Sequence, residues 1–322
     1  MAVEASAAPP PLVPEPGAVS AAVAPARAIG SLARRLEPAL FFGPALVLLL
    51  CFMFYPLVNG FWLSTQRQVL TRPLDTGFVG LENYQRLIDD ALFWLSLTNS
   101  VLWVVGSVTL QFTFGLALAV ILHQRMAARG LFRAIALAPW AVSGMLTALM
   151  WSFMYEAQIG VVNDLLLKMG VIHERVAWLA NLDTALAAVI VANVWRGVPF
   201  FTISLLAALQ TIPPELYEAA AIDGVGTIGR FRYITLPLIK DMIVITTLLR
   251  AIWNFNFVDL IYALTGGGPA GHTLTMPVYI FVTAYRSLDF GYGSALAVVL
   301  FLVLLVFTVV YFKLSGFGRD EA

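Results

Sequence analysis

Polar and aromatic side chains inside two strongly apolar stretches are the residues of this chain best placed to do chemistry. A polar group in hydrocarbon is costly unless it faces other protein groups or a water-filled path. Aromatic faces beside amide groups suit a sugar, whose C–H faces stack on rings while its hydroxyls need directional hydrogen bonds. The pattern therefore predicts noncovalent binding of a sugar-like solute by Asn193, Trp195, Arg196, Gly197, Phe200, Trp253, Asn254, Asn256 and Phe257.

Packing between helices is the alternative explanation, because asparagine and tryptophan also stabilise helix–helix contacts in membranes. Gly197 and Pro199 loosen the backbone hydrogen bonds of their segment, which membranes tolerate where a helix lines a cavity. Arg196 is open to three roles, which are contact with an anionic solute, pairing with a lipid phosphate, and a bond to a neighbouring carbonyl. The cluster as a whole favours solute contact.

The sequence lacks the residue groups that covalent catalysis or metal binding would need. His123, His173 and His272 fall in or at the edges of three different loops, without a partner at metal-ligand spacing. The single cysteine, Cys51, cannot form an internal disulfide. We therefore predict that the chain is not an enzyme and that it binds no cofactor and no metal itself.

One glycine-rich segment, Gly266–Thr273, nearly fits the phosphate-binding pattern G-x-x-x-x-G-K-[ST]. His272 stands where that pattern has its lysine, and no strand is expected before the segment. The sequence therefore predicts a glycine-rich turn between membrane segments.

Composition places the chain among polytopic membrane proteins. Its 322 residues have a mean hydropathy of +0.85 and are only 12% charged, and the net charge of zero argues against nucleic acid as a partner. An all-α fold with about six transmembrane helices is expected, because six apolar segments approach or exceed the roughly 20 residues that cross a bilayer core. These are Leu40–Ser64, Trp94–His123, Leu131–Tyr155, Thr184–Gln210, Leu238–Leu264 and Tyr292–Leu314.

The flanking segments differ in character. Residues 1–37 are rich in alanine and proline and are predicted to be a disordered cytoplasmic tail. They lack the short apolar core and cleavage site of a signal peptide. Residues 38–316 are the predicted transmembrane domain, with a polar loop at residues 211–240, and residues 317–322 are a short C-terminal tail.

Lysine and arginine set the expected orientation. With the N-terminus inside the cell, the cytoplasmic side holds eleven of these residues in its loops and the outer side holds six, as the positive-inside rule requires. Both termini and the Glu215–Lys240 loop are then predicted to be cytoplasmic. Val161–Met169 is predicted to be a helix on the membrane surface. Pro277–Leu288, too short to span, is predicted to be an interfacial or re-entrant helix at the outer face.

Glu215–Lys240 has the pattern of two short helices joined by a glycine turn. Pro213 and Pro214 suit a first helical turn, where the N–H that proline lacks would have no partner. Gly224 stands where a left-handed residue would end the first helix, and Thr227 is a candidate cap of the second.

This loop also carries a resemblance. Glu218–Ala220, Asp223–Gly224 and Ile234–Pro237, at their spacing, resemble the EAA loop of ABC importer permeases. Leu264–Pro269 resembles the LTxGGP turn of carbohydrate-importing permeases, and Phe78–Tyr84 resembles the matching region of sugar-type permeases. The chain is thus identified as a member of the carbohydrate-type ABC importer permeases, of the maltose and glycerol-phosphate kind, with a MetI-like fold.

The resemblance implies a machine of several subunits in the bacterial inner membrane. It implies a second homologous permease, two cytosolic ATPases that bind ATP and Mg²⁺, and an extracytoplasmic solute-binding protein. The loop would dock in a cleft of the ATPase, with Glu215, Glu218, Ala219, Ala220, Asp223, Gly224, Leu236 and Pro237 as its coupling residues. Maltose-type permeases hold their sugar at positions that match Gly197, Phe200, Trp253, Asn254, Asn256 and Phe257, and the maltose permease has asparagine where Phe257 stands.

The predicted function is therefore that of a permease subunit in an ATP-driven, binding-protein-dependent sugar importer. The alternative is an ion-coupled secondary transporter that acts without an ATPase. Such a transporter would usually place acidic groups near mid-membrane and contain internal repeats. Asp259 is the main carboxylate of the apolar segments and lies near a segment end, so the first prediction is favoured.

Overall fold

The computed structural model describes residues 42–124 and 126–316. The chain divides into two units, Met1–Leu57 and Val58–Ala322. The described part of the first unit belongs to a helix that covers Phe42–Ser64 and contains a π-helical turn, Leu50–Phe54, followed by α2 (Tyr55–Ser64). The predicted tails at residues 1–37 and 317–322 lie outside the described residues.

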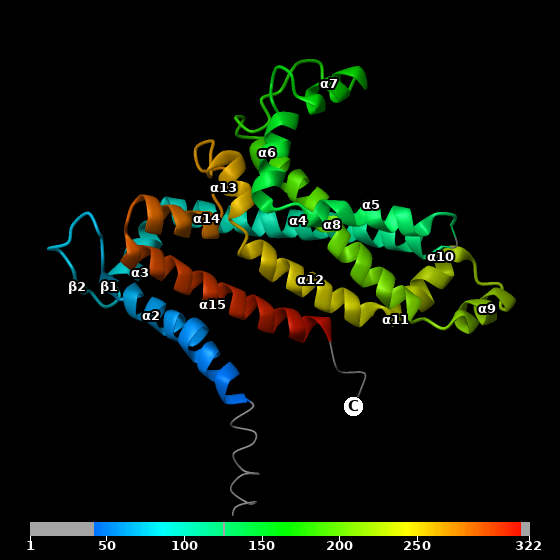
Figure 1. Cartoon of the computed structure of the whole chain (residues 1–322), viewed down its shortest axis with the longest axis horizontal. Coiled ribbons are helices and arrows are strands. Elements are labelled where there is room, and N and C mark those ends of the chain that lie inside the picture. Colours follow the sequence, from blue (N-terminus) through cyan, green and yellow to red (C-terminus); the bar gives the residue numbers. More distant parts are fainter. Residues whose placement is uncertain (1–41, 125, 317–322) are drawn as a thin grey trace, which may run out of the picture. The chain divides into compact units, whose positions relative to one another are not determined.

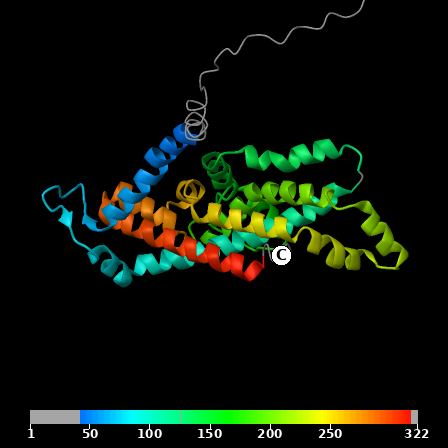
Figure 2. The ribbon, with the colours of Figure 1, turned by 90° about the horizontal axis from the view of Figure 1, so that it is seen from below.

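Three long helices of the described second unit are apolar enough to cross a membrane: α4 (Ala91–His123), α8 (Ala185–Gln210) and α15 (Phe290–Ser315). α4 packs along α8, as Figures 1 and 2 show. Gly115 of α4 permits this close approach, because a Cβ atom there would collide with Phe201 of α8. At 1.5 Å per residue α4 is about 50 Å long, which exceeds the hydrocarbon core of a bilayer.

Two further helix pairs are apolar enough to cross a membrane but are broken. α5 (Arg129–Ala141) and α6 (Gly144–Met154) meet at an angle of 97°, and α12 (Lys240–Phe255) and α13 (Asp259–Thr265) at 45°. The sequence prediction places both segments correctly, but their interruption corrects the expectation of continuous helices. Among the described residues, four helices are long and apolar enough to cross a membrane, and the two bent pairs raise the number of spans to six if each pair is one span.

The first break has a local cause. Val142 has extended backbone angles and ends α5, which contains Pro139 in its last turn. The hydroxyl of Ser143 then caps α6 by accepting a hydrogen bond of 3.3 Å from the Leu146 amide. Serine is a preferred N-cap residue, so a new helix direction starts at Ser143.

Short elements complete the described fold. Strands β1 (Gln66–Arg67) and β2 (Gly77–Phe78) pair antiparallel and precede α3 (Glu82–Asp89). The predicted helix at Val161–Met169 is confirmed as α7 (Val161–Lys168). The predicted short helix at Pro277–Leu288 is confirmed as α14 (Met276–Phe281) with a π-helical turn, Val282–Arg286, and its first four side chains are buried.

The polar loop forms α9 (Pro214–Ile222), α10 (Thr227–Arg230), a π-helical turn (Phe231–Thr235) and α11 (Leu236–Leu238). Within the second unit, α9 and α10 lie at the end opposite to the β1–β2 hairpin (Figure 1). The long helices run between these two ends.

Near the hairpin end, one carboxylate joins three helices. Asp90 caps α4 by accepting from the Leu92 amide at 2.9 Å, and it also accepts hydrogen bonds from the hydroxyls of Tyr279 in α14 and Tyr292 in α15. We call this arrangement the Asp90 clamp. Burial raises the pKa of Asp90, but the hydrogen bonds to its carboxylate outweigh burial and hold the pKa below its usual value.

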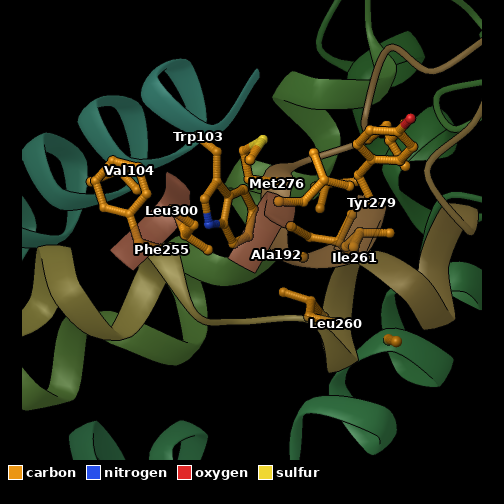
Figure 3. Close-up of a cluster of buried hydrophobic side chains, with 14 of the residues drawn as sticks. Trp103, Val104, Ala192, Phe255, Leu260, Ile261, Met276, Tyr279 and Leu300 are labelled. Atoms are coloured by element: carbon orange, nitrogen blue, oxygen red, sulfur yellow. The ribbon is translucent and has the colours of Figure 1, made fainter. Parts of the chain in front are cut away.

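The larger hydrophobic core lies where α4, α6, α8, α12, α13, α14 and α15 meet, and Figure 3 shows part of it. Trp103 stands at its centre and is 1% exposed. Its indole N–H donates to the Asn254 carbonyl at 3.0 Å, which satisfies the one polar group that a buried tryptophan carries. The core therefore fixes the end of α12, just before the second helix break.

Candidate functional site

A cavity of about 200 Å³ lies beside the two helix breaks. Its walls combine three aromatic rings, one amide and two guanidinium groups. The lining residues are Trp140 of α5, Arg196 of α8, Arg250, Trp253 and Asn254 of α12, and Phe257 between α12 and α13.

A buried polar network connects three helices beneath this cavity. The Nε of Arg250 donates to Gln111 Oε1 at 2.6 Å, and Gln111 Nε2 donates to the Asn193 carbonyl at 2.9 Å. Asn193 Nδ2 donates in turn to Ser107 Oγ at 3.0 Å and to Asn254 Oδ1 at 3.2 Å. Each residue of the network is at most 5% exposed, so α4, α8 and α12 are joined by hydrogen bonds that water does not weaken.

Gly197 explains how the network fits between the helices. A Cβ atom at this position would collide with both the amide group of Gln111 and the guanidinium of Arg250. Glycine is therefore needed at this point of α8 for close approach, and its negative φ does not itself require glycine.

The network leaves three buried polar atoms without a partner among the described residues: Asn193 Oδ1, Arg250 Nη2 and Asn254 Nδ2. An unpaired buried polar group costs about 1–3 kcal/mol. Arg250 and Asn254 also line the cavity, so two unpaired donors belong to residues in its wall. Both donor atoms are themselves buried in this conformation, so the acceptor oxygens of a ligand would reach them only after the cavity wall opens.

Arg196 is held by the protein itself. Its Nε donates to the Val142 carbonyl at 3.1 Å, and its guanidinium lies 5.0 Å from the centre of the Phe257 ring. Asp259 is close enough to attract its charge. Of the three roles that the sequence left open, the structure shows the bond to a neighbouring carbonyl.

The nine predicted solute residues fall into distinct places. Arg196, Trp253, Asn254 and Phe257 line the cavity, and Asn193 and Gly197 lie at the network beneath it. Phe200 packs edge-on against Trp253, with 5.1 Å between ring centres.

The other two predicted residues, Trp195 and Asn256, belong neither to the cavity lining nor to the polar network. Trp195 packs edge-on against Trp151 at 6.3 Å. Asn256 is exposed, and its amide donates to the Ile252 carbonyl of its own helix at 2.9 Å.

Sequence reasoning missed four residues of this region: Ser107, Gln111, Trp140 and Arg250. Gln111 and Arg250 did carry a signal, because each is a strongly polar residue in the middle of an apolar segment, where such groups are costly. Trp140 and Ser107 carried none, since tryptophan and serine are ordinary residues of membrane helices.

The glycine-rich segment Gly266–Thr273 is confirmed as a turn. It follows helix α13 directly, and Gly266 ends that helix in the left-handed conformation. Thr273 Oγ1 donates to the Gly268 carbonyl at 2.7 Å. Asn99 of α4 donates to the Gly271 carbonyl at 2.9 Å, so the backbone of the turn is held by the protein.

Residues 111–315 match the family model described as the binding-protein-dependent transport system inner membrane component. The chain belongs to this family. The family membership inferred from the loop and turn motifs is thereby confirmed, and the permease is a transport subunit with a multi-pass membrane fold.

Relatives of the permease cover most of its length. It is 42% identical over 277 residues to the trehalose/maltose transport system permease protein of Thermococcus litoralis. This match covers 86% of the chain and 92% of the relative. It is 37% identical over 283 residues to the sulfoquinovosyl glycerol transport system permease protein of Agrobacterium fabrum, and this match covers 88% of the chain and 91% of the relative.

A solved structure shows the same fold. A chain of a bacterial alginate ABC transporter, crystallised with an alginate pentasaccharide-bound periplasmic protein, superposes with a TM-score of 0.77. The match covers 90% of the permease and 97% of that chain at 21% identity. The all-α permease fold expected from the sequence is confirmed.

The polar loop of the permease presents most of its predicted coupling residues to solvent. Ala220 is buried and Leu236 is half-buried, whereas Glu215, Glu218, Ala219, Asp223, Gly224 and Pro237 are exposed. Large apolar side chains of the loop are exposed as well, and these are Leu216, Ile222, Ile228 and Tyr233. Exposed apolar groups in such a number are typical of a protein interaction surface.

The turn within this loop has the predicted geometry. Gly224 has φ +76°, in the left-handed region that glycine adopts without strain, and the Val225 amide donates to the Ala220 carbonyl at 2.8 Å. Thr227 does not cap α10, because Gly226 holds the N-cap position. The prediction of a threonine cap is wrong by one residue, since the chain is already helical at Thr227.

Proposed function

We propose that the permease forms half of the path by which a sugar or sugar-like solute crosses the bacterial inner membrane. The observation that carries this proposal is the cavity wall, where the unpaired donors of Arg250 and Asn254 belong to residues beside the rings of Trp253 and Phe257. Rings receive the C–H faces of a sugar and donors receive its oxygens. The named solutes of the two relatives, trehalose/maltose and sulfoquinovosyl glycerol, support the same class.

The energy would come from another subunit. The exposed apolar side chains of Ile222, Ile228 and Tyr233, with the acidic side chains Glu215 and Glu218 of α9, form a surface suited to a cleft in an ATPase. The exposed residues Ala219, Asp223, Gly224 and Pro237 belong to this surface, and Ala220 and Leu236 support it from within. ATP and Mg²⁺ bind to that ATPase, and the permease itself catalyses no covalent reaction.

The remaining partners follow from the family and the predicted orientation. A second homologous permease completes the path, two ATPases bind on the cytoplasmic side, and a solute-binding protein delivers solute from outside. Both chain termini and the α9–α11 loop are cytoplasmic in this arrangement, and the β1–β2 hairpin is outside. The alginate transporter with its periplasmic protein supports such an assembly.

Transport then proceeds by alternating access. Closure of the ATPase pair on ATP binding displaces the loop, and the long helices transmit the displacement to the helix breaks beside the cavity. The cavity opens outward to accept solute and inward after ATP hydrolysis. Hydrogen bonds of the polar network keep α4, α8 and α12 together during this change.

Two neighbouring asparagines test the solute site in the assembled transporter. Asn254→Ala removes an amide from the cavity wall, and we expect the half-saturating solute concentration for uptake to rise about tenfold or more, which equals about 1.4 kcal/mol. Asn256→Ala, the matched variant outside the cavity lining, should change it less than twofold. Equal effects of the two substitutions, or none, would refute this site.

The coupling surface is tested by a glycine pair. Gly224 and Gly226 both have free space where a Cβ would lie, but only Gly224 has a positive φ. We therefore expect Gly224→Val to reduce solute-stimulated ATP hydrolysis at least fivefold, because valine strains this turn by about 1–2 kcal/mol. Gly226→Val serves as the control and should retain most of the solute-stimulated ATP hydrolysis. Wild-type stimulation in Gly224→Val, or uptake driven by an ion gradient without ATPase, would contradict the proposal.

A further inference from the structure

The two helix breaks of the permease lie against each other. A Cβ atom added at Gly144, the first residue of α6, would lie 3.0 Å from the Phe257 ring and 3.1 Å from Asp259 Cβ. Phe257 belongs to the break between α12 and α13, and Asp259 is the first residue of α13. α6 also packs directly on α13. A change at one break therefore reaches the other through contact.

Arg196 of α8 binds the first break. The last carbonyl groups of a helix lack partners within the helix, and a cation near them is favourable because of the helix dipole. The Arg196 Nε supplies a donor to one such group, the Val142 carbonyl at the end of α5. The bond is charge-assisted and comes from a different helix.

The same guanidinium reaches the second break. It lies over the Phe257 ring at 5.0 Å, within the distance at which a cation is attracted to an aromatic face. Asp259 attracts its charge and Arg250, the other cation of the cavity, repels it. The two charges lie on α12 and α13, the helices on either side of the second break.

We propose that Arg196 is a positioning residue that ties the α5–α6 break to the α12–α13 break and so sets the shape of the cavity between them. The tie uses the hydrogen-bonding and ring-facing sides of one guanidinium, so a lysine cannot reproduce both contacts in the same geometry. Its consequence for solute binding rests on the function proposed above, whereas the tie itself belongs to the fold.

Hydrogen–deuterium exchange of the full-length permease in its assembled transporter tests the tie without measuring transport. Arg196→Met keeps an apolar stem of similar length but removes the charge and the donor. We expect amides in residues 142–147 and in residues 256–262 to exchange about tenfold faster or more. Arg286→Met is the matched control for residues 142–147, because Arg286 also lies over a ring, that of Tyr262 at 5.4 Å, and belongs to the turn Val282–Arg286, outside α5 and α6.

A second variant separates a tie from a local cap. Phe257→Leu removes the ring and leaves the Val142 bond possible, and we expect faster exchange at residues 142–147 as well as at residues 256–262. If Arg196→Met and Phe257→Leu each act only at their own break, or if neither changes exchange, the proposal is overturned.

A transport measurement then links the tie to the cavity. Arg196→Met should raise the half-saturating solute concentration at least fivefold while the maximal rate of ATP hydrolysis stays within twofold, and Arg196→Lys should recover part of the affinity. A wild-type transporter that moves no solute would refute the proposed function and leave the exchange result standing. A normal exchange pattern in active Arg196→Met would refute the tie alone.

Discussion

Two asparagines, Asn163 and Asn193, are both fully buried, yet their surroundings differ. In the loop helix α7, Asn163 Nδ2 donates to the carbonyls of Ala157 and Val176, and its Oδ1 accepts from the Val176 amide and the Trp178 indole. Asn193, beneath the cavity, uses its Nδ2 twice but leaves its Oδ1 without a partner. One amide is fully paired and the other is not.

The difference separates a structural role from a functional one. A fully paired buried amide stabilises a single conformation, and removing it leaves its former partners unpaired. An incompletely paired amide beside a cavity contributes less to stability and leaves hydrogen-bonding capacity for water or a ligand. Burial alone would rank Asn163 and Asn193 as equals, so the count of satisfied atoms is what distinguishes them.

The largest effect that follows from this comparison concerns Asn163→Leu. Leucine leaves the Trp178 indole and the Val176 amide unpaired in a buried loop, so we expect a loss of about 2–5 kcal/mol in stability. Thermal unfolding of the assembled transporter should show a clearly lower midpoint. Solute affinity of the folded fraction should be unchanged, and an unchanged midpoint would show that the pairing of Asn163 does not stabilise the fold.

Asn193→Leu should give the reverse pattern. Its apolar side chain removes two hydrogen bonds, to Ser107 Oγ and Asn254 Oδ1, but it also removes an oxygen that was unpaired, so the loss of stability should be about 1–2 kcal/mol and smaller than for Asn163→Leu. The half-saturating solute concentration should rise about tenfold, or about 1.4 kcal/mol, because Asn254 loses the partner that orients its amide. A large loss of stability with normal affinity would make Asn193 a second structural asparagine and remove the contrast.

The smallest effect concerns the Asp90 clamp, a paired group that also titrates. The pKa of Asp90 is lowered in the folded state, so its ionised carboxylate stabilises the fold. This stabilisation is complete above the pKa of aspartate in the unfolded chain, which is about 3.9. It is lost as the pH falls through the lower pKa of the folded state. Asp90→Asn should therefore lower the unfolding midpoint slightly at pH 7, since solvent screens this partly exposed site.

At a pH below the folded pKa of Asp90, wild type and Asp90→Asn should unfold at the same temperature. Arg286→Met is a substitution outside the clamp, and its difference from wild type in unfolding temperature should be the same at both pH values. A difference that persists or grows on acidification would contradict the lowered pKa.

Sequence reasoning placed the long helices, the loop turn and most of the cavity wall. Apolar length locates α4, α8 and α15 because hydrophobic burial in a bilayer depends mainly on segment length. Gly224 was predictable because a left-handed turn is a local requirement. These features depend on residues close in sequence.

The helix breaks could not be predicted in the same way. The first break joins a local cap, Ser143, to a bond from Arg196, which lies more than fifty residues away in sequence. For Trp195 the choice of helix face was the difficulty, because it is adjacent to the lining residue Arg196 and a shift of one position turns a helical side chain by about 100°. Asn256 lies at the end of α12, where the helix stops and the break to α13 begins.

The Asp90 clamp and the loop lie at opposite ends of the long helices, which makes the bundle a lever. If α4 pivots at the clamp, Gln111 lies 21 residues from the pivot, which is about 30 Å along the helix. The other end of α4 lies about 50 Å from the pivot. A rigid tilt that moves the loop end of α4 by 5 Å would move Gln111 by about 3 Å. In the transport cycle proposed above, the position of the polar network along α4 would set how far a displacement of the loop moves the cavity.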